Sequence, residues 1–459
     1  MHRGGALRTV AIAFWLVTLA LFSGKVLAEP AKISTHQALD RWASFNVSQQ
    51  ADFIEQLIVQ GHLDLADAQI AKTRFGAEGQ DRRLFIQGRL LRARGRTAEA
   101  IGVYRDLLAQ RPNYDRVRLE LAQTLAQHGE DESARHHFEL LLGANASSRE
   151  VDQTVRAFID TLDGRRRWNA TAYVTVAPST NVNQGTNQDV VMLNGLPFAI
   201  NAGARRTSGV GLVAGAQAGY QLPLATSLDL VFAGGGQTKV YRDSSFSDAI
   251  INASVGPRWR FNNGSVGVYA TSDYRWIAGD VYGKGIGGLV SGYLRLSQRD
   301  AVHGSVACSR RLFDTAWAGS DLSYQDGHVC SVDGRIEHAM TSTTSVRVLG
   351  GVGQERTGRV HLNNNHWYAG AGVFRELPLG VSMYFEGKYT RRDYEGIFPA
   401  MGVGRLDGRW DLAVNLTKRD LNIFGFAPML QYTFTHNVSN VGLYDFDAHS
   451  VNVTLTKKF

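Results

Sequence analysis

Hydrophobic and polar residues alternate with a period of two at the end of the chain. The alternating positions form two sets, with Val451, Val453, Leu455, Lys457 and Phe459 on one face and Asn452, Thr454, Thr456 and Lys458 on the other. This pattern predicts a β-strand with one apolar and one polar face. If the apolar face meets lipid, the strand must belong to a closed barrel, because unpaired backbone groups are too costly in hydrocarbon.

The same alternation continues from Trp168 onward and predicts fourteen strands. They cover residues 168–177, 207–221, 226–239, 247–260, 265–278, 286–298, 301–314, 322–338, 343–356, 366–377, 381–393, 405–417, 421–436 and 446–459. Long connections such as 178–206 alternate with short ones such as 299–300. Long outer loops and short periplasmic turns are typical of outer-membrane barrels of Gram-negative bacteria. We therefore predict a 14-stranded antiparallel transmembrane β-barrel; the alternative, a soluble β-sandwich, would not need fourteen strands joined as sequential hairpins.

Segment 381–393 has the two faces that such a barrel requires. The residues predicted to face lipid are Met383, Phe385 and Tyr389, and those predicted to line the lumen are Tyr384, Glu386, Lys388, Thr390 and Arg392. Charged side chains are tolerated in the lumen because water or partner charges reach them there. An even number of strands also places both ends of the barrel on the periplasmic side.

The chain from Ser48 to about Leu142 repeats with a period of roughly 34 residues, which is the length of a tetratricopeptide repeat, a pair of helices. Four sets of positions keep this step: Gly61, Gly95 and Gly129; Leu57, Leu91 and Leu125; Ala66, Ala100 and Ala134; and Ile70, Tyr104 and Phe138. In the middle unit, Gly88 permits close helix approach and Gly95 falls in the turn. Three units suffice for a small α-solenoid, and a last helix at about 147–162 is expected to cover its open end.

Basic and aromatic residues recur on the inner helices of this predicted solenoid. By similarity to other tetratricopeptide repeats, the residues on the concave side would be Arg82, Phe85, Arg89, Arg92 and Arg116. One interpretation is a basic groove for an acidic or extended segment of a client protein or a periplasmic chaperone. The other is an ordinary solvated helix face.

The N-terminus reads as a secretory signal peptide. Two arginines precede a short apolar run, and residues 26–28 offer a small-residue cleavage site between Ala28 and Glu29; an uncleaved anchor is the alternative. We therefore expect a signal peptide at 1–28, a periplasmic tetratricopeptide domain at 29–164 and the barrel at 165–459. The arginine run 165–167 is expected to be a linker at the membrane edge.

Composition narrows the class of protein. The net charge is +7 and the mean hydropathy is −0.18, but no single segment is strongly basic, so nucleic acid is not an expected partner. No zinc spacing, phosphate-binding loop or nucleophile motif is present, so we expect no cofactor, no metal, no catalytic residues and no enzyme activity. The pairs His303/Ser305 and His449/Ser450 suggest a hydrolase only weakly. The glycine-rich run 283–288 is expected to be a flexible loop edge.

The two cysteines, Cys308 and Cys330, lie at equal distances on either side of Gly319, inside the loop that joins two predicted strands. They can therefore be cross-strand neighbours on one face. A disulfide is plausible in an oxidising envelope, but a direct cross-strand bridge is geometrically strained, so both redox states stay open.

Two stretches of the barrel resemble one known family. They are residues 178–184, just after the first strand, and the ending from Pro428 through Ser439-Asn440-Val441 to Lys457-Lys458-Phe459. Both are similar to the surface lipoprotein assembly modulator (Slam) family. The terminal Phe459 also resembles the signal by which the barrel-assembly machinery recognises outer-membrane barrels. The resemblance implies an outer-membrane translocator for surface lipoproteins or, in some members, secreted haem- or metal-acquisition proteins.

Two other functions remain compatible with the sequence. One is an exopolysaccharide export porin, which joins similar repeats to a barrel but usually needs a longer array and a lumen of one charge sign. The other is a passive nutrient porin, which has no need of repeats. The long first loop, which carries Asn181 and Asn183, is either a plug that folds into the lumen or an ordinary surface loop.

Overall fold

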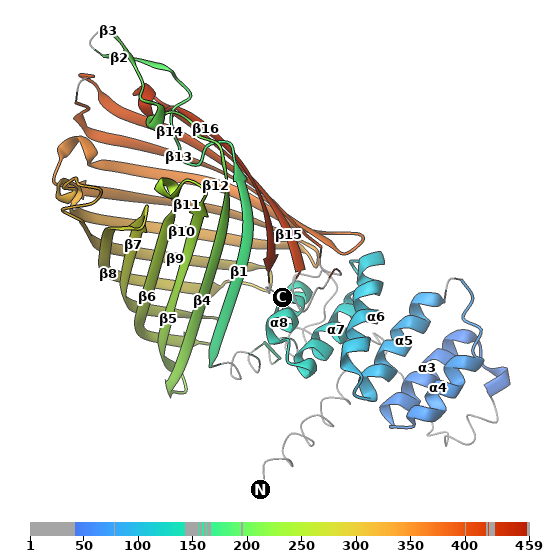
Figure 1. Cartoon of the computed structure of the whole chain (residues 1–459). Coiled ribbons are helices and arrows are strands. Elements are labelled where there is room, and N and C mark those ends of the chain that lie inside the picture. The colour runs from blue at the N-terminus through green and yellow to red at the C-terminus, as the bar shows by residue number, and fades with distance from the viewer. Residues whose placement is uncertain are drawn as a thin grey trace. The chain divides into compact units, whose positions relative to one another are not determined.

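The computed structural model describes residues 42–77, 79–142, 155, 158–159, 162, 167–193, 196–399, 401–418, 421 and 427–456. The chain divides near residue 164 into two compact units, a helical one and a barrel (Figure 1). The predicted signal peptide with its cleavage site at Ala28 and Glu29, and the terminal Phe459, lie outside the described residues.

The helical unit consists of consecutive helix pairs. Its elements are η1 (Trp42–Ser44), α3 (Val47–Val59), α4 (Leu63–Lys72), α5 (Gln80–Ala93), α6 (Thr97–Gln110), α7 (Asp115–His128) and α8 (Asp131–Leu142). The turn inside each pair is made by Gly61, Gly95 or Gly129, which have φ of +83°, +79° and +91°. Only glycine adopts this left-handed conformation without steric cost, which explains why glycine recurs at the same place in each repeat. None of the described helices is long and apolar enough to cross a membrane.

The core of the solenoid is built from the repeated positions. Ala66, Ala100, Ala134, Tyr104 and Phe138 are all 0% exposed, which confirms the tetratricopeptide architecture. Of the predicted helix at 147–162, only four residues are described. They are helical, and Val155, Ile159 and Leu162 are buried in the same core while Phe158 packs against it.

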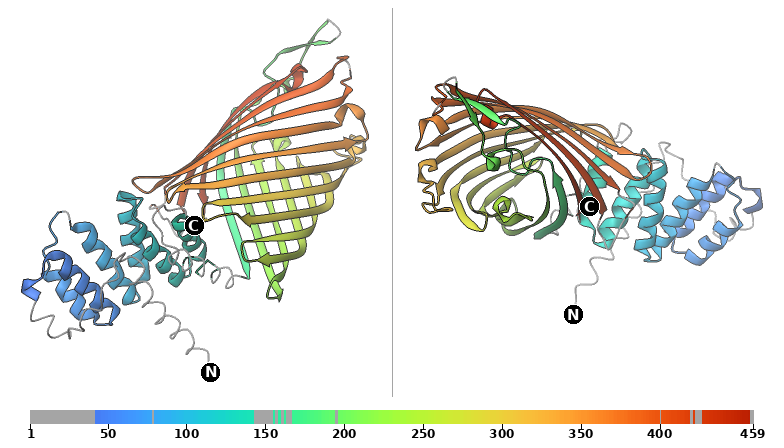
Figure 2. Two further views of the ribbon diagram at one scale, coloured as in Figure 1. Left: turned by 180° about the vertical axis from the view of Figure 1, so that it is seen from behind. Right: turned by 45° about the horizontal axis from the view of Figure 1, so that its top comes forward.

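The barrel contains all fourteen predicted strands, each paired with its neighbours in an antiparallel sheet that closes on itself (Figures 1 and 2). They are β1 (Trp168–Ser179), β4 (Gly209–Ala225), β5 (Leu228–Tyr241), β6 (Asp248–Phe261), β7 (Gly264–Ile277), β8 (Asp280–Arg295), β9 (Asp300–Phe313), β10 (Gly327–Thr341), β11 (Thr344–Thr357), β12 (Asn364–Leu377), β13 (Val381–Ile397), β14 (Gly404–Lys418), β15 (Ala427–Ser439) and β16 (Phe446–Thr456). Two further strands, β2 (Val190–Leu193) and β3 (Leu196–Ala199), form a separate hairpin within the first loop.

Several strand boundaries differ from the prediction, among them the following three. Strand β15 begins at Ala427, not at 421, and β10 begins at Gly327, after a short 3-10 turn. The glycine run 283–288 lies inside β8, not in a loop, and only residues 278–279 connect β7 to β8. The reason is close strand packing: a Cβ on Gly285 would lie 2.3 Å from Asp273 Oδ1, and one on Gly287 would lie 2.4 Å from the Cys308 carbonyl oxygen. Glycine is therefore required there by its neighbours.

The two faces of the barrel differ as the alternation predicts. Apolar side chains exposed on the outer face include Val174, Leu212, Phe232, Ile251, Val268, Val290, Val332, Val348, Phe385, Leu430 and Val453. On β13, Phe385 is 41% exposed, and Tyr389 packs between Trp367 and Trp410 with ring centroids 5.7 and 4.9 Å away. An apolar outer band of this kind is what a lipid environment requires.

A tight helix contact gives a test of the solenoid. A Cβ at Gly88 would lie 2.5 Å from the Tyr104 ring, so Gly88→Ala should destabilise the helical unit by about 1–3 kcal/mol through overpacking. Urea unfolding of the full chain in detergent, followed by the helical circular dichroism signal, measures this.

Gly102→Ala is the matched control, because a Cβ at this exposed position of α6 meets nothing within 4 Å. That change should leave stability equal or slightly higher, since alanine favours a helix more than glycine does. Equal unfolding curves for the two variants would contradict the packing.

Candidate functional site: the barrel lumen and its closing seam

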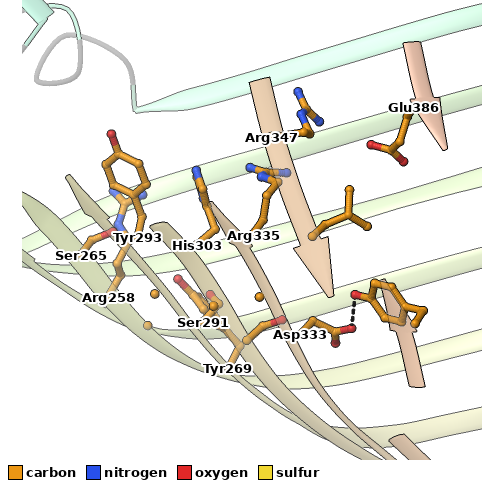
Figure 3. A pocket seen from close by; sticks show the side chains of 17 residues that line it. Arg258, Ser265, Tyr269, Ser291, Tyr293, His303, Asp333, Arg335, Arg347 and Glu386 are labelled. Atoms are coloured by element: carbon orange, nitrogen blue, oxygen red, sulfur yellow. Dashed lines mark hydrogen bonds between the residues drawn. The ribbon is translucent and has the colours of Figure 1, made fainter. Parts of the chain in front are cut away.

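One wall of the lumen carries charged and aromatic side chains around a cavity of about 680 Å³ (Figure 3). Strands β6 to β13 contribute them, and the polar members are Arg258, Ser265, Tyr269, Ser291, Tyr293, His303, Ser305, Asp333, Arg335, Arg347, Tyr368 and Glu386. All come from inward positions of the alternation, since the outward neighbours on the same strands are apolar. We call this surface the charged wall.

The charged side chains of this wall contact groups of opposite charge or hydroxyls. The Tyr368 hydroxyl donates to Asp333 Oδ1 at 2.6 Å, the bond drawn in Figure 3. The Arg335 and Arg347 side chains both approach Glu337 Oε1, at 3.0 and 3.7 Å. Arg347 also lies 4.5 Å above a tyrosine ring. The charged wall therefore carries both signs of charge, like the lumen residues predicted for segment 381–393.

A second wall of the lumen is polar but nearly uncharged. It surrounds a cavity of about 560 Å³ lined by β1, β4, β5, β15 and β16. Its hydroxyl and amide side chains are Tyr173, Thr175, Ser179, Asn181, Gln184, Gln237, Tyr241, Gln431, Thr433, Thr435, Ser450, Asn452 and Thr454; Lys239 is the charged residue among those that line it. We call this surface the neutral wall. It lies along the pair β1–β16, which closes the barrel and which we call the seam.

The first loop is anchored beside the seam by Asn181 and Asn183. Asn181 is 3% exposed, and its side-chain amide donates to the carbonyls of Gly185 at 2.9 Å and Asp447 at 3.0 Å. Asn183 donates to the Arg205 carbonyl at 2.8 Å and accepts from the Thr207 backbone N–H at 3.1 Å. Both asparagines therefore shape the loop, and Asn181 ties it to β16.

The two stretches that carry the family resemblance meet at this place. Thr186, just beyond the first stretch, donates from its hydroxyl to the Gly442 carbonyl at 2.7 Å. A Cβ on Gly442 would lie 2.5 Å from the Gln188 side-chain oxygen. In the second stretch, Val441 is 0% exposed and the Asn440 side chain bonds the start of β14. The two stretches that resemble the family therefore lie together in the structure, where the first and last loops meet beside the seam.

The rest of the first loop extends away from the barrel. Among the described residues, strands β2 and β3 pair with each other and with no other strand. The hairpin lies beyond the ends of the neighbouring strands (Figures 1 and 2). Residues 181–184 contribute to the neutral wall, but the hairpin does not fill the lumen. Its position supports an ordinary surface loop over a plug.

Cys308 and Cys330 lie directly opposite each other on β9 and β10 and are joined as a disulfide, with 4.1 Å between their Cα atoms. They share a face with Val306 and Val332, which are 47% and 50% exposed, so the bridge is on the outer surface of the barrel.

The two His–Ser pairs that weakly suggest a hydrolase are placed differently in the barrel. His449 accepts or donates a hydrogen bond at 2.8 Å with Tyr432, which is on the outer face, whereas Ser450 lines the lumen. His303 and Ser305 both face the lumen, and the His303 ring lies 4.8 Å from that of Tyr293.

The predicted groove of the solenoid needs a correction. Phe85 is 0% exposed and Arg89 only 5%, so neither presents a contact surface on the concave side. The arginines instead surround two buried carboxylates, Glu55 and Glu120. The contacts are Arg82–Glu55 at 2.5 Å, Arg89–Glu55 at 2.5 Å, Arg92–Glu120 at 2.5 Å and Arg116–Glu55 at 2.5 Å. The prediction, made by similarity to other repeats, named the arginines but missed the glutamates, which come from α3 and α7.

The arginines and glutamates of this buried Arg–Glu cluster pair with one another. Burial alone would lower the pKa of Arg89, but Glu120 and Glu55 raise that pKa above its ordinary value. The guanidinium therefore stays charged inside the solenoid. Arg82 and Arg116 are the more exposed members of the cluster, with side chains 30% and 31% exposed.

The fold and lumen together define a class: an outer-membrane β-barrel protein with N-terminal tetratricopeptide repeats. Residues 168–459 match the protein family described as "Surface lipoprotein assembly modifier", and residues 78–138 match "Surface lipoprotein assembly modifier, N-terminal TPR repeats". The first match covers more than half of the chain, so the chain belongs to this family, as the sequence resemblance indicates.

Two relatives align over most of their length. "Surface lipoprotein assembly modifier 1" of Haemophilus influenzae is 21% identical over 375 residues, 80% of this chain and 76% of the relative. "Surface lipoprotein assembly modifier 2" of Neisseria meningitidis serogroup B is 25% identical over 395 residues, 78% of this chain and 76% of the relative. Among solved structures, a Pseudomonas aeruginosa FadL homologue covers 66% of this chain and 92% of its own, at 10% identity and a TM-score of 0.38.

The Arg–Glu cluster gives a prediction for stability. Glu55→Gln removes the carboxylate shared by three arginines, and breaking a buried ion pair costs about 3–5 kcal/mol. The helical unit should therefore unfold at clearly lower urea concentration in the full chain, measured by the helical circular dichroism signal.

The control is Glu99→Gln, which breaks the Arg96–Glu99 pair, whose side chains are 52% and 56% exposed. An exposed ion pair contributes little, so this variant should unfold like the unchanged protein. If Glu55→Gln also does so, the cluster does not stabilise the solenoid.

The position of the hairpin gives a second prediction. Deleting residues 190–199 should leave small-solute permeability unchanged, because the hairpin lies outside the lumen. Liposome swelling with the purified protein measures this, with equal amounts of the unchanged protein as the control. A clear rise in solute flux would restore the plug interpretation.

Proposed function

We propose that this protein delivers specific client proteins across the outer membrane to the cell surface, and that lipoproteins are the main clients. The observation that carries the proposal is membership of the surface lipoprotein assembly modifier family over the whole barrel. Relatives from two organisms carry that name over most of the chain. The role is transport and assembly, without a chemical step on the client.

The arrangement in the envelope follows from strand parity. Both ends of the barrel domain leave from the side opposite the long first loop, because the number of strands is even. With long loops at the cell surface, the repeats would lie in the periplasm, preceded in the precursor by a cleaved signal peptide. Insertion would depend on the barrel-assembly machinery.

The repeats would receive the client before it crosses. Tetratricopeptide solenoids bind extended segments on their concave side, where similarity to other repeats places the partly exposed Arg82 and Arg116. An acidic or extended client segment, alone or with a periplasmic chaperone, fits that charge. Secreted haem- or metal-acquisition proteins are the second class of client that the family resemblance implies.

The lumen argues against a polysaccharide exporter, and the solenoid argues against a passive nutrient porin. An exopolysaccharide exporter needs a lumen of one charge sign, whereas the Arg335, Arg347 and Asp333 side chains are matched with opposite charges or hydroxyls. A passive nutrient porin needs no solenoid, yet this chain has one built from consecutive helix pairs.

Deletion of the gene tests the proposal. The expected result is that one or a few lipoproteins disappear from the protease-accessible pool of intact cells while their total cellular amounts stay similar, measured by quantitative proteomics before and after surface proteolysis. Expression of the unchanged gene from a plasmid should restore them. Loss of matrix polymer or of solute uptake, with an unchanged surface proteome, would instead support export of polysaccharide or a porin.

A further inference from the structure

The seam has the shortest ladder among the described residues, which on β16 end at Thr456. Among the described residues, β1 and β16 share five register pairs, whereas every other neighbouring pair of barrel strands shares at least eleven. The pairs run from Tyr173↔Thr456 to Val176↔Val453 and resume at Ser179↔Ser450. Two positions in the middle, Ala177 and Pro178, are left without a register partner on β16.

Pro178 explains the gap. Its carbonyl accepts a hydrogen bond from the Ser450 hydroxyl at 3.2 Å, so the carbonyl points toward β16. In an antiparallel strand the N–H and C=O of one residue point to the same side. Proline has no N–H, so the missing donor is in the seam itself. Other barrel strands also contain proline, at Pro223, Pro257 and Pro428, but Pro178 is the one whose missing N–H lies in the closing pair of strands.

Side chains and loop contacts replace the missing ladder bonds. The hydroxyls of Thr175 and Thr454 are 2.7 Å apart. Beyond the end of the ladder, the Thr180 N–H donates to the His449 carbonyl at 2.9 Å and the His449 N–H donates to the Thr180 hydroxyl at 3.0 Å. The Asn181 bond to the Asp447 carbonyl completes the set.

The lumen next to the seam suits an extended polypeptide. The neutral wall presents hydroxyl and amide groups, which both donate to and accept from peptide groups. It binds no particular side-chain charge, so clients of different sequence can pass. By contrast, the charged wall is formed by strands on the other side of the lumen.

We propose that β1 and β16 separate during delivery and that the freed edge of β1 pairs with an extended strand of the client polypeptide. This inference rests on the proposed function, because it assumes that a polypeptide is delivered. A freed strand edge in hydrocarbon must find backbone partners. A client strand supplies the same N–H and C=O groups that β16 supplies at rest, whereas lipid supplies none.

A cross-link across the seam tests the separation. Thr175→Cys with Thr454→Cys places two thiols where the hydroxyls already touch. The client is the lipoprotein whose surface exposure is lost in the deletion strain. After oxidation of intact cells and induction of the client, its appearance at the surface is followed by protease accessibility. We expect loss of newly exposed client, with recovery after a reducing agent is added.

The matched control is a cross-link between β6 and β7. This pair has the same two-residue gap, because Gly256 and Pro257 fall between the pairs Val255↔Ala270 and Arg258↔Gly267. Ser254→Cys with Thr271→Cys, at facing positions, should leave delivery unchanged. Normal delivery through the cross-linked seam overturns the proposal, and so does equal loss with both cross-links, because then no single pair of strands is special.

A photo-crosslinking amino acid identifies the occupant of the edge. At Val176, which is 51% exposed on β1, it should capture the arriving client in intact cells. At Val332, 50% exposed on β10, it should not. Adducts with lipid alone at Val176 would overturn the pairing. If the deletion strain exposes all its lipoproteins normally, the proposed function fails; if only the seam experiments fail, the proposed function stands without this inference.

Discussion

The need to pair every backbone N–H and C=O in hydrocarbon governs this structure. Thirteen pairs of neighbouring strands meet that need locally, between strands that follow each other along the chain. The closing pair is different, since Thr175 and Thr454, which touch across it, are 279 positions apart. Bringing such distant segments together costs chain entropy. The first and last loops, joined through Asn181, Thr186 and Gly442, contribute the contacts that hold this closure.

The helical unit solves a different problem. Each helix pair leaves an apolar face that only the next pair can cover, so glycine turns and small residues recur at fixed spacing. Buried charge is added to this apolar core, with four arginines around Glu55 and Glu120. Burying charged groups costs free energy unless each is paired. The need to keep these pairs favours one relative arrangement of α3, α5 and α7.

The sequence predicts most of the fold, because both of its periodicities are strong. The constant step between the repeated glycines and alanines corresponds to the solenoid, and the alternation after Trp168 corresponds to all fourteen strands. Predictions failed where tertiary contacts override local pattern. The glycine run 283–288 resembles a loop, yet it lies within β8 because Asp273 and Cys308 on the adjacent strands leave no space for a Cβ.

Prediction of the site was less complete for the same reason. Similarity to other tetratricopeptide repeats predicts Phe85 and Arg89 on the concave side. Their burial depends on tertiary partners such as Glu55, which lies one whole repeat earlier in the chain than Arg89. The two walls of the lumen were also missed, although the parity of each strand contains that information. To predict a neutral wall and a charged wall, one must also know which strands lie side by side around the lumen.

The disulfide has a consequence that depends on its place in the strand order. Counting from the closing pair, β9 is the seventh strand in one direction and β10 the seventh in the other, so the Cys308–Cys330 bridge is diametrically opposite β1–β16. A covalent bond there excludes rupture at that point of the circumference. If the curvature of the sheet changes, β9 and β10 stay joined. The two halves of the barrel, of seven strands each, would then move relative to this fixed pair.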